Sequence, residues 1–358
     1  MTGAPVQQLG VIFGGRSVEH EVSVVSARGV MREADPQRFE VVPFGITRHG
    51  AWLTPEETRA RLVRVEAGET RSLGDDEGAG AFGYPEVTAR LREMDVVFPI
   101  VHGTFGEDGT LQGLLEMAEI PYVGSGVAAS AVGMDKALMR AVFAAHGVPQ
   151  TEYVVLADEE TRSPSPATMR RIETEIGYPC FVKPANGGSS VGVSRARSRE
   201  DFGEALAGAA RYDRKVLVEA AVTGREVECA VLGNHAPEPS PLGEIRPTTE
   251  FYDYSAKYLD DSAALVVPAE VSPASAELVR LLAVRAYRAL DCAGLARVDF
   301  FLEPDGGVKC IEVNTLPGFT PISMYPRLWQ EAGLSYRDLI SRLVDLAFER
   351  FEEVRAHA

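Results

Sequence analysis

The chain has 358 residues, of which 45% are hydrophobic and 25% are charged. This length is more than one hydrophobic core normally holds, so the composition predicts a globular protein of two or three domains. The formal net charge of -16 argues against a nucleic-acid partner, because phosphate backbones repel an acidic surface.

Signals that would direct the chain to a membrane or out of the cell are missing from the sequence. No apolar stretch reaches the length of a membrane span, and the short run Leu9–Phe13 lacks the basic flank of a signal peptide. Four cysteines show no C-x-x-C pairing, and three lie in apolar runs that are typical of reduced, buried thiols. We therefore expect a cytoplasmic protein with no membrane partner.

The first 124 residues alternate between apolar runs and helical patterns, which predicts a parallel sheet with helices on both faces. A helical pattern starts near Glu21, and the polar segment Pro55–Tyr84 is expected to form a helix and a surface excursion. The expected strands are Leu9–Phe13, Val41–Ile46 and Asp95–Val101. We assign this N-terminal domain to residues 1–124.

Two further units of the α+β type are predicted, over residues 125–219 and 220–358. The central unit begins with a helix, Val127–His146, which Gly147 and Pro149 end. Its other expected elements are the strands Tyr153–Leu156, Cys180–Lys183, Val191–Arg195 and Val216–Glu219 and the helices Ala167–Ile176 and Glu200–Ala210. The third unit is expected to hold the strands Glu226–Leu232, Leu295–Leu302 and Val308–Val313, a loop over Ile245–Asp261, the helix Ala274–Leu290 and C-terminal helices.

Two loops follow strands of the N-terminal domain, at the place where ligands bind in open α/β sheets. Gly14 and Gly15 lead from the first strand to Glu19, which combines backbone donors with a carboxylate. The segment from His102 to Gly109 places three glycines and two acids after a later strand. Both loops fit the wall of a polar substrate site, and a simple turn is the alternative for each.

Lysine is sparse in this chain, with five lysines among 36 basic residues. A position that keeps lysine is a candidate for a site that needs a compact, flexible cation, although chance explains any single one equally well. Lys183 ends a strand and precedes the Gly/Ser-rich segment 186–192, whose backbone N–H groups and hydroxyls can cover phosphates. The G-K-[ST] ending of a P-loop is missing, and an ordinary hairpin is the alternative.

Acids also mark the junction between two strands further along the chain. Glu219 ends one strand and Glu226 opens the next. The backbone between them can pair with an adenine edge, and Glu226 can accept hydrogen bonds from ribose hydroxyls. A strand edge with solvated acids is the alternative.

The sharpest constellation joins two strands near the C-terminus. Arg297 and Asp299 lie two positions apart on one strand, and Glu312 and Asn314 lie two apart on the next. Since such positions share a face of a strand, the pattern predicts a guanidinium, two carboxylates and an amide on one surface. An all-oxygen set of this kind suits Mg²⁺ that holds nucleotide phosphates, and the arginine can stabilise developing negative charge. A surface salt-bridge ladder is the alternative.

A polar aromatic segment, Phe251–Tyr258, contains the rare Lys257 and three tyrosines. Its length and polarity predict a lid that closes over a reacting anion. Aromatic packing under a loop is the alternative.

These motifs together resemble the D-alanine–D-alanine ligase family of the ATP-grasp superfamily. The pieces stand in the family's order over about residues 10–324: GGRSVEHEVS, HGTFGEDGTLQGLLE, IPYVGSG, MDK, FVKPANGGSSVGVS, FYDYSAKY, RVDFFLE and IEVNTLPGFTPIS. The resemblance implies an α/β and α+β protein with a three-domain ATP-grasp fold and an N-terminal parallel-sheet (pre-ATP-grasp) domain.

The activity implied by the resemblance is the ATP-dependent joining of two D-alanines into D-alanyl-D-alanine through an acyl phosphate, for peptidoglycan precursor synthesis. ATP would be a substrate, two Mg²⁺ ions the cofactors with Mn²⁺ as an alternative metal, and a homodimer the assembly. Two other functions stay open, a D-alanine–D-lactate ligase of the same fold and a catalytically silent nucleotide-binding regulator. Tyr258 argues against the first, because ester-forming members carry a histidine at that position.

The resemblance also implies roles for individual residues. The catalytic residues would be Glu19, Ser189, Tyr258, Arg297 and Gly318, the first three as a hydrogen-bonded triad and the last two at the oxyanion. The residues that bind the D-alanines would be Glu19 and His102 for the first molecule and Ser323 and Met324 for the second. The ATP-binding residues would be Lys136, Lys183, Ser190, Glu219, Ala220, Val222, Glu226 and Lys257, and the metal ligands Asp299, Glu312 and Asn314. Some members carry lysine at the position of Ala220, whose implied contact is through its backbone.

Overall fold

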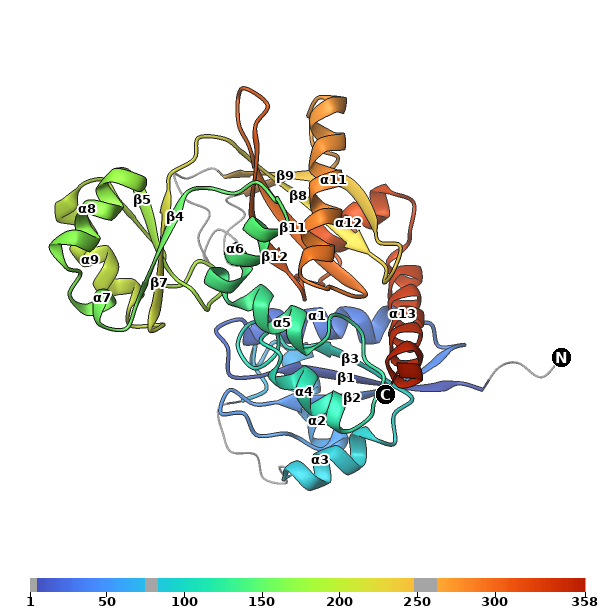
Figure 1. The fold of residues 1–358 in the computed structure, drawn as a ribbon. Helices are drawn as coiled ribbons and strands as arrows, with labels where there is room; N and C mark the ends of the chain where they lie inside the picture. Colours follow the sequence, from blue (N-terminus) through green and yellow to red (C-terminus); the bar gives the residue numbers. More distant parts are fainter. Residues whose placement is uncertain (1–4, 75–82, 248–262, 358) are drawn as a thin grey trace.

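A computed structural model describes residues 5–74, 83–247 and 263–357, and these residues form three sheets with helices around them (Figure 1). The N-terminal sheet has the strand order β2-β1-β3, and both neighbours of β1 run parallel to it. Its elements are β1 (Gln7–Gly14), α1 (His20–Glu33), β2 (Phe39–Ile46), α2 (Pro55–Glu66), α3 (Tyr84–Leu91), β3 (Val96–Ile100) and α4 (Thr110–Met117). The prediction of a parallel sheet is confirmed.

The single helix predicted over residues 127–146 is wrong. The chain forms two helices there, α5 (Val127–Met134) and α6 (Lys136–Ala145). Asp135 separates them because its backbone is extended and its side chain accepts hydrogen bonds from the N–H groups of Ala137 and Leu138. A side-chain cap of this kind starts a new helix, so Lys136 stands in the first turn of α6.

The central sheet is antiparallel, with the strand order β4-β7-β5-β6. Its elements are β4 (Tyr153–Ala157), α7 (Glu159–Arg162), α8 (Pro166–Glu175), β5 (Cys180–Pro184), β6 (Ser194–Ala196), α9 (Arg199–Ala209) and β7 (Lys215–Ala220). Strand β6 is shorter than the strand predicted over residues 191–195. Ser189, Ser190 and Gly192 have φ angles of 49°, 59° and 76°, which a strand cannot contain, so pairing starts only at Ser194.

The third sheet has the strand order β10-β9-β8-β11-β12. Its elements are β8 (Arg225–Leu232), β9 (Glu238–Pro247), β10 (Ala263–Val266), α11 (Pro273–Ala289), β11 (Leu295–Leu302), β12 (Val308–Asn314), α12 (Met324–Glu331) and α13 (Tyr336–His357). Strand β9 was not predicted, and the loop expected from Ile245 begins inside it. Pro239 and Pro241 lie in the half of β9 that β10 does not pair with. On the side of β9 that faces away from β8, the N–H that a proline lacks would therefore have no strand partner.

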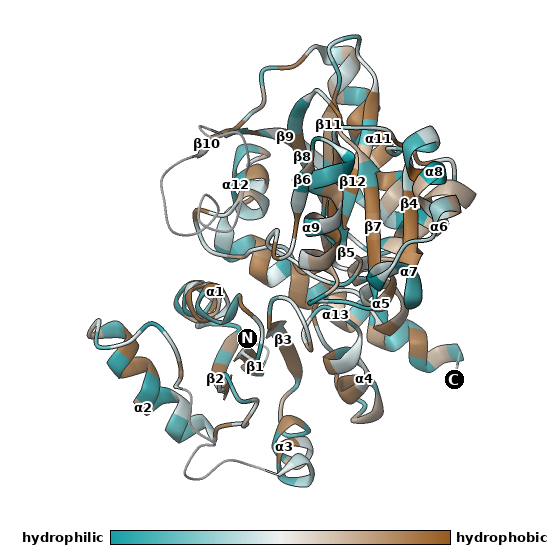
Figure 2. Cartoon of the chain, turned by 90° about the vertical axis from the view of Figure 1, so that its left-hand side faces the viewer, coloured by the Kyte–Doolittle hydropathy of each residue, from teal (hydrophilic) through white to brown (hydrophobic). Residues whose placement is uncertain are grey.

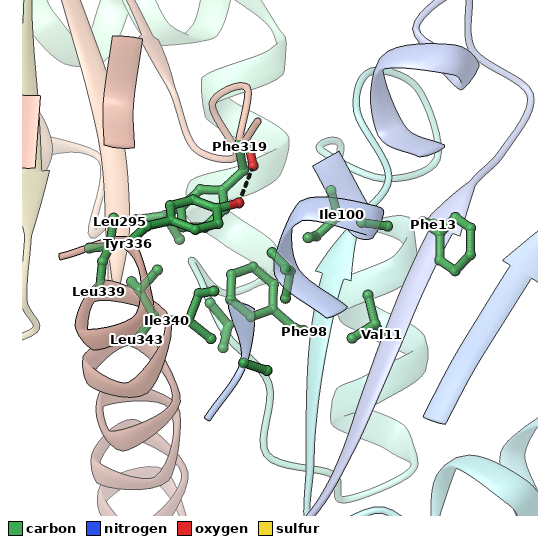
Figure 3. Close-up of a cluster of buried hydrophobic side chains, with 14 of the residues drawn as sticks. Val11, Phe13, Phe98, Ile100, Leu295, Phe319, Tyr336, Leu339, Ile340 and Leu343 are labelled. Carbon is green, nitrogen blue, oxygen red and sulfur yellow. Dashed lines mark hydrogen bonds between the residues drawn. The ribbon is translucent and has the colours of Figure 1, made fainter. Parts of the chain in front are cut away.

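The hydrophobic core of the N-terminal sheet is completed by the C-terminal end of the chain. Helix α13 lies along this sheet in Figure 1, and Figure 3 shows its residues facing Phe98 of β3. The rings of Phe98 and Phe319 have centroids 5.4 Å apart, and the hydroxyl of Tyr336 donates to the carbonyl of Phe319 at 2.6 Å. One core therefore joins residues of the first and third predicted units, whose exact boundaries stay a prediction.

The central sheet has a core of its own, formed with α8 and α9. Strands β4 and β7 are largely hydrophobic in Figure 2, and their buried residues include Val154, Leu156, Val216 and Val218. All four cysteines, Cys180, Cys229, Cys292 and Cys310, are buried and free, whereas the sequence predicted this for three of them. Within the described ranges, no helix is long and apolar enough to cross a membrane.

Candidate active site

A cavity of about 1100 Å³ opens where the three sheets meet. It collects predicted site residues that are far apart in the sequence, and both apolar and polar side chains form its walls. The predicted residues that line it are Glu19, His102, Lys136, Ser189, Arg297, Glu312, Asn314, Gly318, Ser323 and Met324.

One wall of the cavity starts at the carboxyl end of β1. Gly14 and Gly15 both have φ above +90°, and a Cβ on Gly14 would lie 2.2 Å from the carbonyl oxygen of Ile46. Only glycine fits there, and the tight turn brings Glu19 to the start of α1. The carboxylate of Glu19 accepts a hydrogen bond from the Ser189 hydroxyl at 2.5 Å, which links the N-terminal domain to the loop of the central unit.

His102 lies beside Glu19 with its side chain buried. Burial lowers the pKa of His102 and outweighs the opposing charge of Glu19, so the ring is neutral at pH 7. Its Nδ1 donates to the carbonyl of Leu316 at 3.2 Å, since a carbonyl oxygen only accepts, and Nε2 lies 3.1 Å from the Ser26 hydroxyl. The ring is thus held between α1 and the loop that follows β12.

Glu107 is a further acid on this wall that the sequence did not single out as a site residue. It lines the cavity, and its carboxylate accepts from the N–H of Gly103 at 2.6 Å. Burial and the nearby charge of Glu19 raise its pKa well above the ordinary value. Two neighbouring carboxyls of this kind favour one neutral and one charged group.

An adjoining wall is the loop of residues 315–323, which Phe319 anchors. The Phe319 side chain is fully buried, and its ring centroid lies 5.4 Å from that of Tyr336 and 6.0 Å from that of Tyr325. Gly318 and Ser323 face the cavity on either side of this anchor. Ser323 is the N-cap residue of α12, so the free N–H groups of a helix start point to this end of the cavity.

The charged residues of β11 and β12 lie as predicted, on one face of the sheet. Arg297 pairs in register with Asn314, and Asp299 pairs with Glu312. The guanidinium of Arg297 donates to both oxygens of Asp299 at 2.8 Å, and the Asn314 amide donates to Asp299 at 2.9 Å. Burial opposes the charge of Arg297, but Asp299 and Glu228 outweigh it and raise its pKa well above the ordinary value.

Glu228 is another cavity residue that was not predicted. It lies on β8 opposite Asp299, and its carboxylate is 3.2 Å from the Arg297 guanidinium. The strand predicted over Glu226–Leu232 held the signal for this residue. Glu228 lies two positions after Glu226, so the two side chains share a face of the strand.

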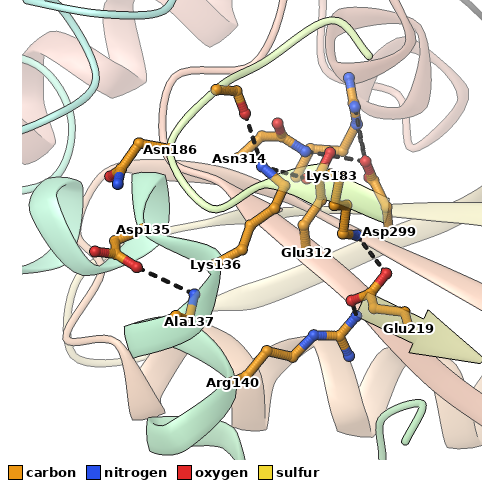
Figure 4. Close-up of polar contacts among 12 residues, drawn as sticks. Asp135, Lys136, Ala137, Arg140, Lys183, Asn186, Glu219, Asp299, Glu312 and Asn314 are labelled. Carbon is orange, nitrogen blue, oxygen red and sulfur yellow. Dashed lines mark hydrogen bonds and ion pairs between the residues drawn. The ribbon is translucent and has the colours of Figure 1, made fainter. Parts of the chain in front are cut away.

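Positive side chains and carboxylates alternate where α6 meets β7 and β12, as Figure 4 shows. Lys136 lies 3.2 Å from Glu312 and donates to the carbonyl of Gly187 at 2.8 Å. Lys183 lies 2.5 Å from Glu219, whose other oxygen accepts from Arg140. Burial lowers the pKa of Lys183, whereas the pKa of Glu219 is lowered because its two cations outweigh burial. A carboxylate with two cations is charged at neutral pH.

Comparisons with known proteins agree with this geometry. Residues 8–125 match the family profile described as D-ala D-ala ligase N-terminus, and residues 142–345 match the one described as D-ala D-ala ligase C-terminus. The chain belongs to the D-alanine–D-alanine ligase family. A relative named D-alanine--D-alanine ligase from Geobacillus thermodenitrificans is 47% identical over 351 residues, which are 97% of this chain and 96% of the relative. One of the same name from Geobacillus kaustophilus is 46% identical and covers the same shares.

Solved structures of this family share the fold. The D-alanine-D-alanine ligase from Coxiella burnetii has a TM-score of 0.81 at 34% identity, over 99% of this chain and 97% of that one. The VanG D-Ala:D-Ser ligase from Enterococcus faecalis has a TM-score of 0.84 at 33% identity, over 96% of this chain and all of the other. The predicted ATP-grasp fold class is confirmed.

Among the described residues of this family member, no group of three or more His, Cys, Asp or Glu residues could hold a metal ion. The set predicted from the resemblance is of another kind, because it has two carboxylates and the amide of Asn314. Asp299 and Glu312 are neighbours across β11 and β12, and their hard oxygen donors fit Mg²⁺ once phosphate oxygens complete the coordination. The residues present therefore fit the implied metal.

Some predicted residues do not line the cavity. Asp299, Lys183 and Glu219 are buried behind its surface, where they contact residues that do line it or one another. Of the other described ones, Ser190 lies on the Gly/Ser loop, Ala220 ends β7, Val222 lies between β7 and β8, and Glu226 is near the start of β8. Lys257 and Tyr258 lie outside the described residues.

Proposed function

We propose that this family member is an ATP-dependent ligase that joins two D-alanine molecules into D-alanyl-D-alanine, for peptidoglycan precursor synthesis. The observation that carries the proposal is that Glu19, Arg297 and Gly318 line one and the same cavity. Membership in the D-alanine–D-alanine ligase family implies ATP as a substrate and a divalent metal as a cofactor.

The chemistry requires activation before the peptide bond forms, since a carboxylate is a poor acyl electrophile. In the proposed reaction, an oxygen of the first D-alanine's carboxylate attacks the γ-phosphorus of ATP, and ADP leaves. The amine of the second D-alanine then attacks the carbonyl carbon of the acyl phosphate. The C–O bond breaks, phosphate leaves, and the amine gives up a proton.

The two substrate ends of the cavity suit two different groups. Glu19 is a buried carboxylate that suits the ammonium of the first D-alanine, with His102 beside it. Ser323 and the N–H of Met324 stand at the start of α12, where a helix favours an anion, so they suit the carboxylate of the second D-alanine. The distinct charges of the two ends orient the two molecules head to tail.

Arg297 and the Gly318 N–H are proposed to stabilise the tetrahedral oxyanion. Both line the same cavity, and the guanidinium is fixed by two hydrogen bonds to Asp299. A donor that is already oriented needs little reorganisation when negative charge develops. This arrangement favours catalysis over a silent regulatory role.

ATP is proposed to lie between the central and third sheets. Lys136 and Lys183 would contact the phosphates, with Ser190 and the loop 187–192 above them. The adenine and ribose would meet the end of β7 (Glu219 and the backbone of Ala220), the backbone of Val222, and Glu226 near the start of β8. Two Mg²⁺ ions, or Mn²⁺, held by Asp299, Glu312 and Asn314 would neutralise phosphate charge during transfer.

The remaining expectations are part of the same proposal. Lys257 would contact ATP from the lid, and Tyr258 would join Glu19 and Ser189 across it. A reaction that consumes ATP suits the cytoplasm, and we expect a homodimer and no nucleic-acid partner.

The test is to incubate the enzyme with ATP and Mg²⁺ and to measure phosphate release and products by chromatography. D-alanine alone should give D-alanyl-D-alanine and one phosphate per dipeptide. D-lactate and D-serine, each in equal competition with D-alanine, separate the ester-forming and the D-Ala:D-Ser alternatives. A predominant ester or D-alanyl-D-serine product at pH 7 would replace the proposal, and no ATP-dependent product would support the silent regulator.

A further inference from the structure

Arg140 is a fully buried arginine on α6 that none of the proposed roles uses. Its side chain is 1% exposed and touches both sheets that would enclose ATP. One terminal nitrogen donates to the carbonyl of Cys310 on β12 at 3.1 Å, and the other donates to the carboxylate of Glu219 on β7. The guanidinium also lies 5.8 Å from the ring centroid of Tyr153.

Arg140 is one end of a buried row of alternating charges. Glu219 stands in the middle of this row and Lys183 at the other end, as Figure 4 shows. Lys136 precedes Arg140 by four residues, one helical turn, and is likewise paired with a carboxylate, that of Glu312. Both lysines proposed for the phosphates are therefore paired with carboxylates of the protein in this structure.

Binding of a nucleotide phosphate by Lys183 has a consequence for Glu219. The ammonium must turn partly or wholly from Glu219 to the phosphate. A buried carboxylate that loses its only cation is strongly unfavourable, because neither water nor a counter-charge replaces the lost partner. Glu219 has a second cation, Arg140, and this one is fixed by its bond to the Cys310 carbonyl.

We propose that Arg140 is a positioning residue for ATP binding, which holds the charge of Glu219 while Lys183 is transferred to a nucleotide phosphate. The inference rests on the proposed function, because it needs Lys183 to be a phosphate ligand. Arginine suits this role better than lysine, since its planar fork can bind a carboxylate and a carbonyl together and it keeps its charge when buried.

The test replaces Arg140 by methionine, which keeps most of the side-chain volume without the charge. The Kd of ATP, measured by calorimetry without D-alanine, should rise at least about tenfold in Arg140→Met. The KM of D-alanine should change less than about twofold. Arg350→Met is the matched control, because Arg350 also contacts a glutamate (Glu116, 3.1 Å) and a tyrosine ring (Tyr122, 4.1 Å to the centroid), but neither partner is a proposed ATP-binding residue. The control should lose stability without a change in ATP affinity.

A second comparison separates charge compensation from a merely structural role, and it uses Glu219→Gln as the background. A neutral glutamine needs no counter-charge, so adding Arg140→Met to Glu219→Gln should change the Kd of ATP by less than about threefold. If the single Arg140→Met variant does not fold, a rise of about tenfold or more in the Kd of ATP between Glu219→Gln and the double variant would still contradict the proposal.

Two results would overturn the inference. One is an unchanged Kd of ATP in folded Arg140→Met. The other is a rise in the Kd of ATP on adding Arg140→Met to Glu219→Gln that equals the rise in the wild-type background. Both results presuppose a wild-type enzyme that forms the dipeptide from D-alanine in the presence of ATP. If the wild type forms none, the proposed function has failed, and the two failures are thereby distinguished.

Discussion

The two loops that border the cavity are held in opposite ways. The loop of residues 315–323 is anchored by the buried Phe319, which packs among aromatic rings of β3, α12 and α13. The loop of residues 187–192 is held by polar contacts from Lys136 to the Gly187 carbonyl and from Ser189 to Glu19, and its last residue, Gly192, lies close to the ring of Tyr212. Hydrophobic packing fixes the first loop, whereas the second is held by bonds that a ligand can replace.

This difference matches the demands of the proposed chemistry. The oxyanion donor and the site for the second carboxylate need a fixed geometry, which a packed aromatic anchor supplies. The phosphate loop must admit ATP and release ADP, so it should open without loss of the core. Two consecutive serines with left-handed backbone also make this loop conformation costly unless its polar contacts persist.

The largest expected effect is on the packed loop. Phe319→Ala should lower the free energy of unfolding by about 3–5 kcal/mol, because it opens a cavity among fully buried rings. Urea unfolding followed by fluorescence and circular dichroism measures this value. Phe105→Ala is the control, since Phe105 is 50% exposed, and a loss of similar size in both variants would contradict the anchoring role of Phe319.

A large loss of activity with a smaller loss of stability is expected at the nucleotide end. Lys183→Ala should raise the KM of ATP and lower kcat, together by about 2–4 kcal/mol in transition-state stabilisation, because a phosphate loses its cation. Steady-state kinetics with ATP varied measures the effect. Lys309→Ala is the control, since Lys309 lies on β12 paired with Glu152 (3.5 Å), and equal mild effects would mean that the sparse lysines are placed by chance.

A contrast between two serines tests the polar loop itself. Ser189→Ala removes the hydrogen bond to Glu19, so kcat should fall about tenfold while the free energy of unfolding changes by less than about 1 kcal/mol. Ser198→Ala removes the N-cap of α9 and should do the reverse, lowering stability by about 1 kcal/mol with activity unchanged. The free energy of unfolding and kcat are measured for both variants. The prediction would be contradicted if the two variants lost activity and stability in the same proportion.

The smallest expected effect is on the pH dependence of stability. The pKa of His102 is lowered in the folded protein, so its contribution is complete above the unfolded value of about 6.5 and is lost as the pH falls through the folded value. The slope of unfolding free energy against pH below 6.5 should therefore be shallower in His102→Asn than in the wild type. Identical slopes in wild type and His102→Asn would show that the histidine is not buried neutral.

The sequence predicted well that the charged residues of β11 and β12 share one face, because strand periodicity is local. Arg297 and Asp299, like Glu312 and Asn314, needed only a period of two, and their register across β11 and β12 was the remaining unknown. Asp135 was harder, since an aspartate inside a continuous helical pattern does not show whether it caps a new helix. Arg140 could not be predicted, because its contacts to Glu219 and Cys310 depend on how α6 packs between two sheets.

The central claim is that the two D-alanines are joined through an acyl phosphate. The most direct measurement uses D-alanine with both carboxylate oxygens labelled as ¹⁸O, with ATP and Mg²⁺, and analyses the released phosphate by mass spectrometry. Since the attacking carboxylate oxygen stays bonded to phosphorus when the amine displaces phosphate, each dipeptide formed should be matched by one phosphate that carries one ¹⁸O. Dipeptide accompanied by unlabelled phosphate would contradict the account.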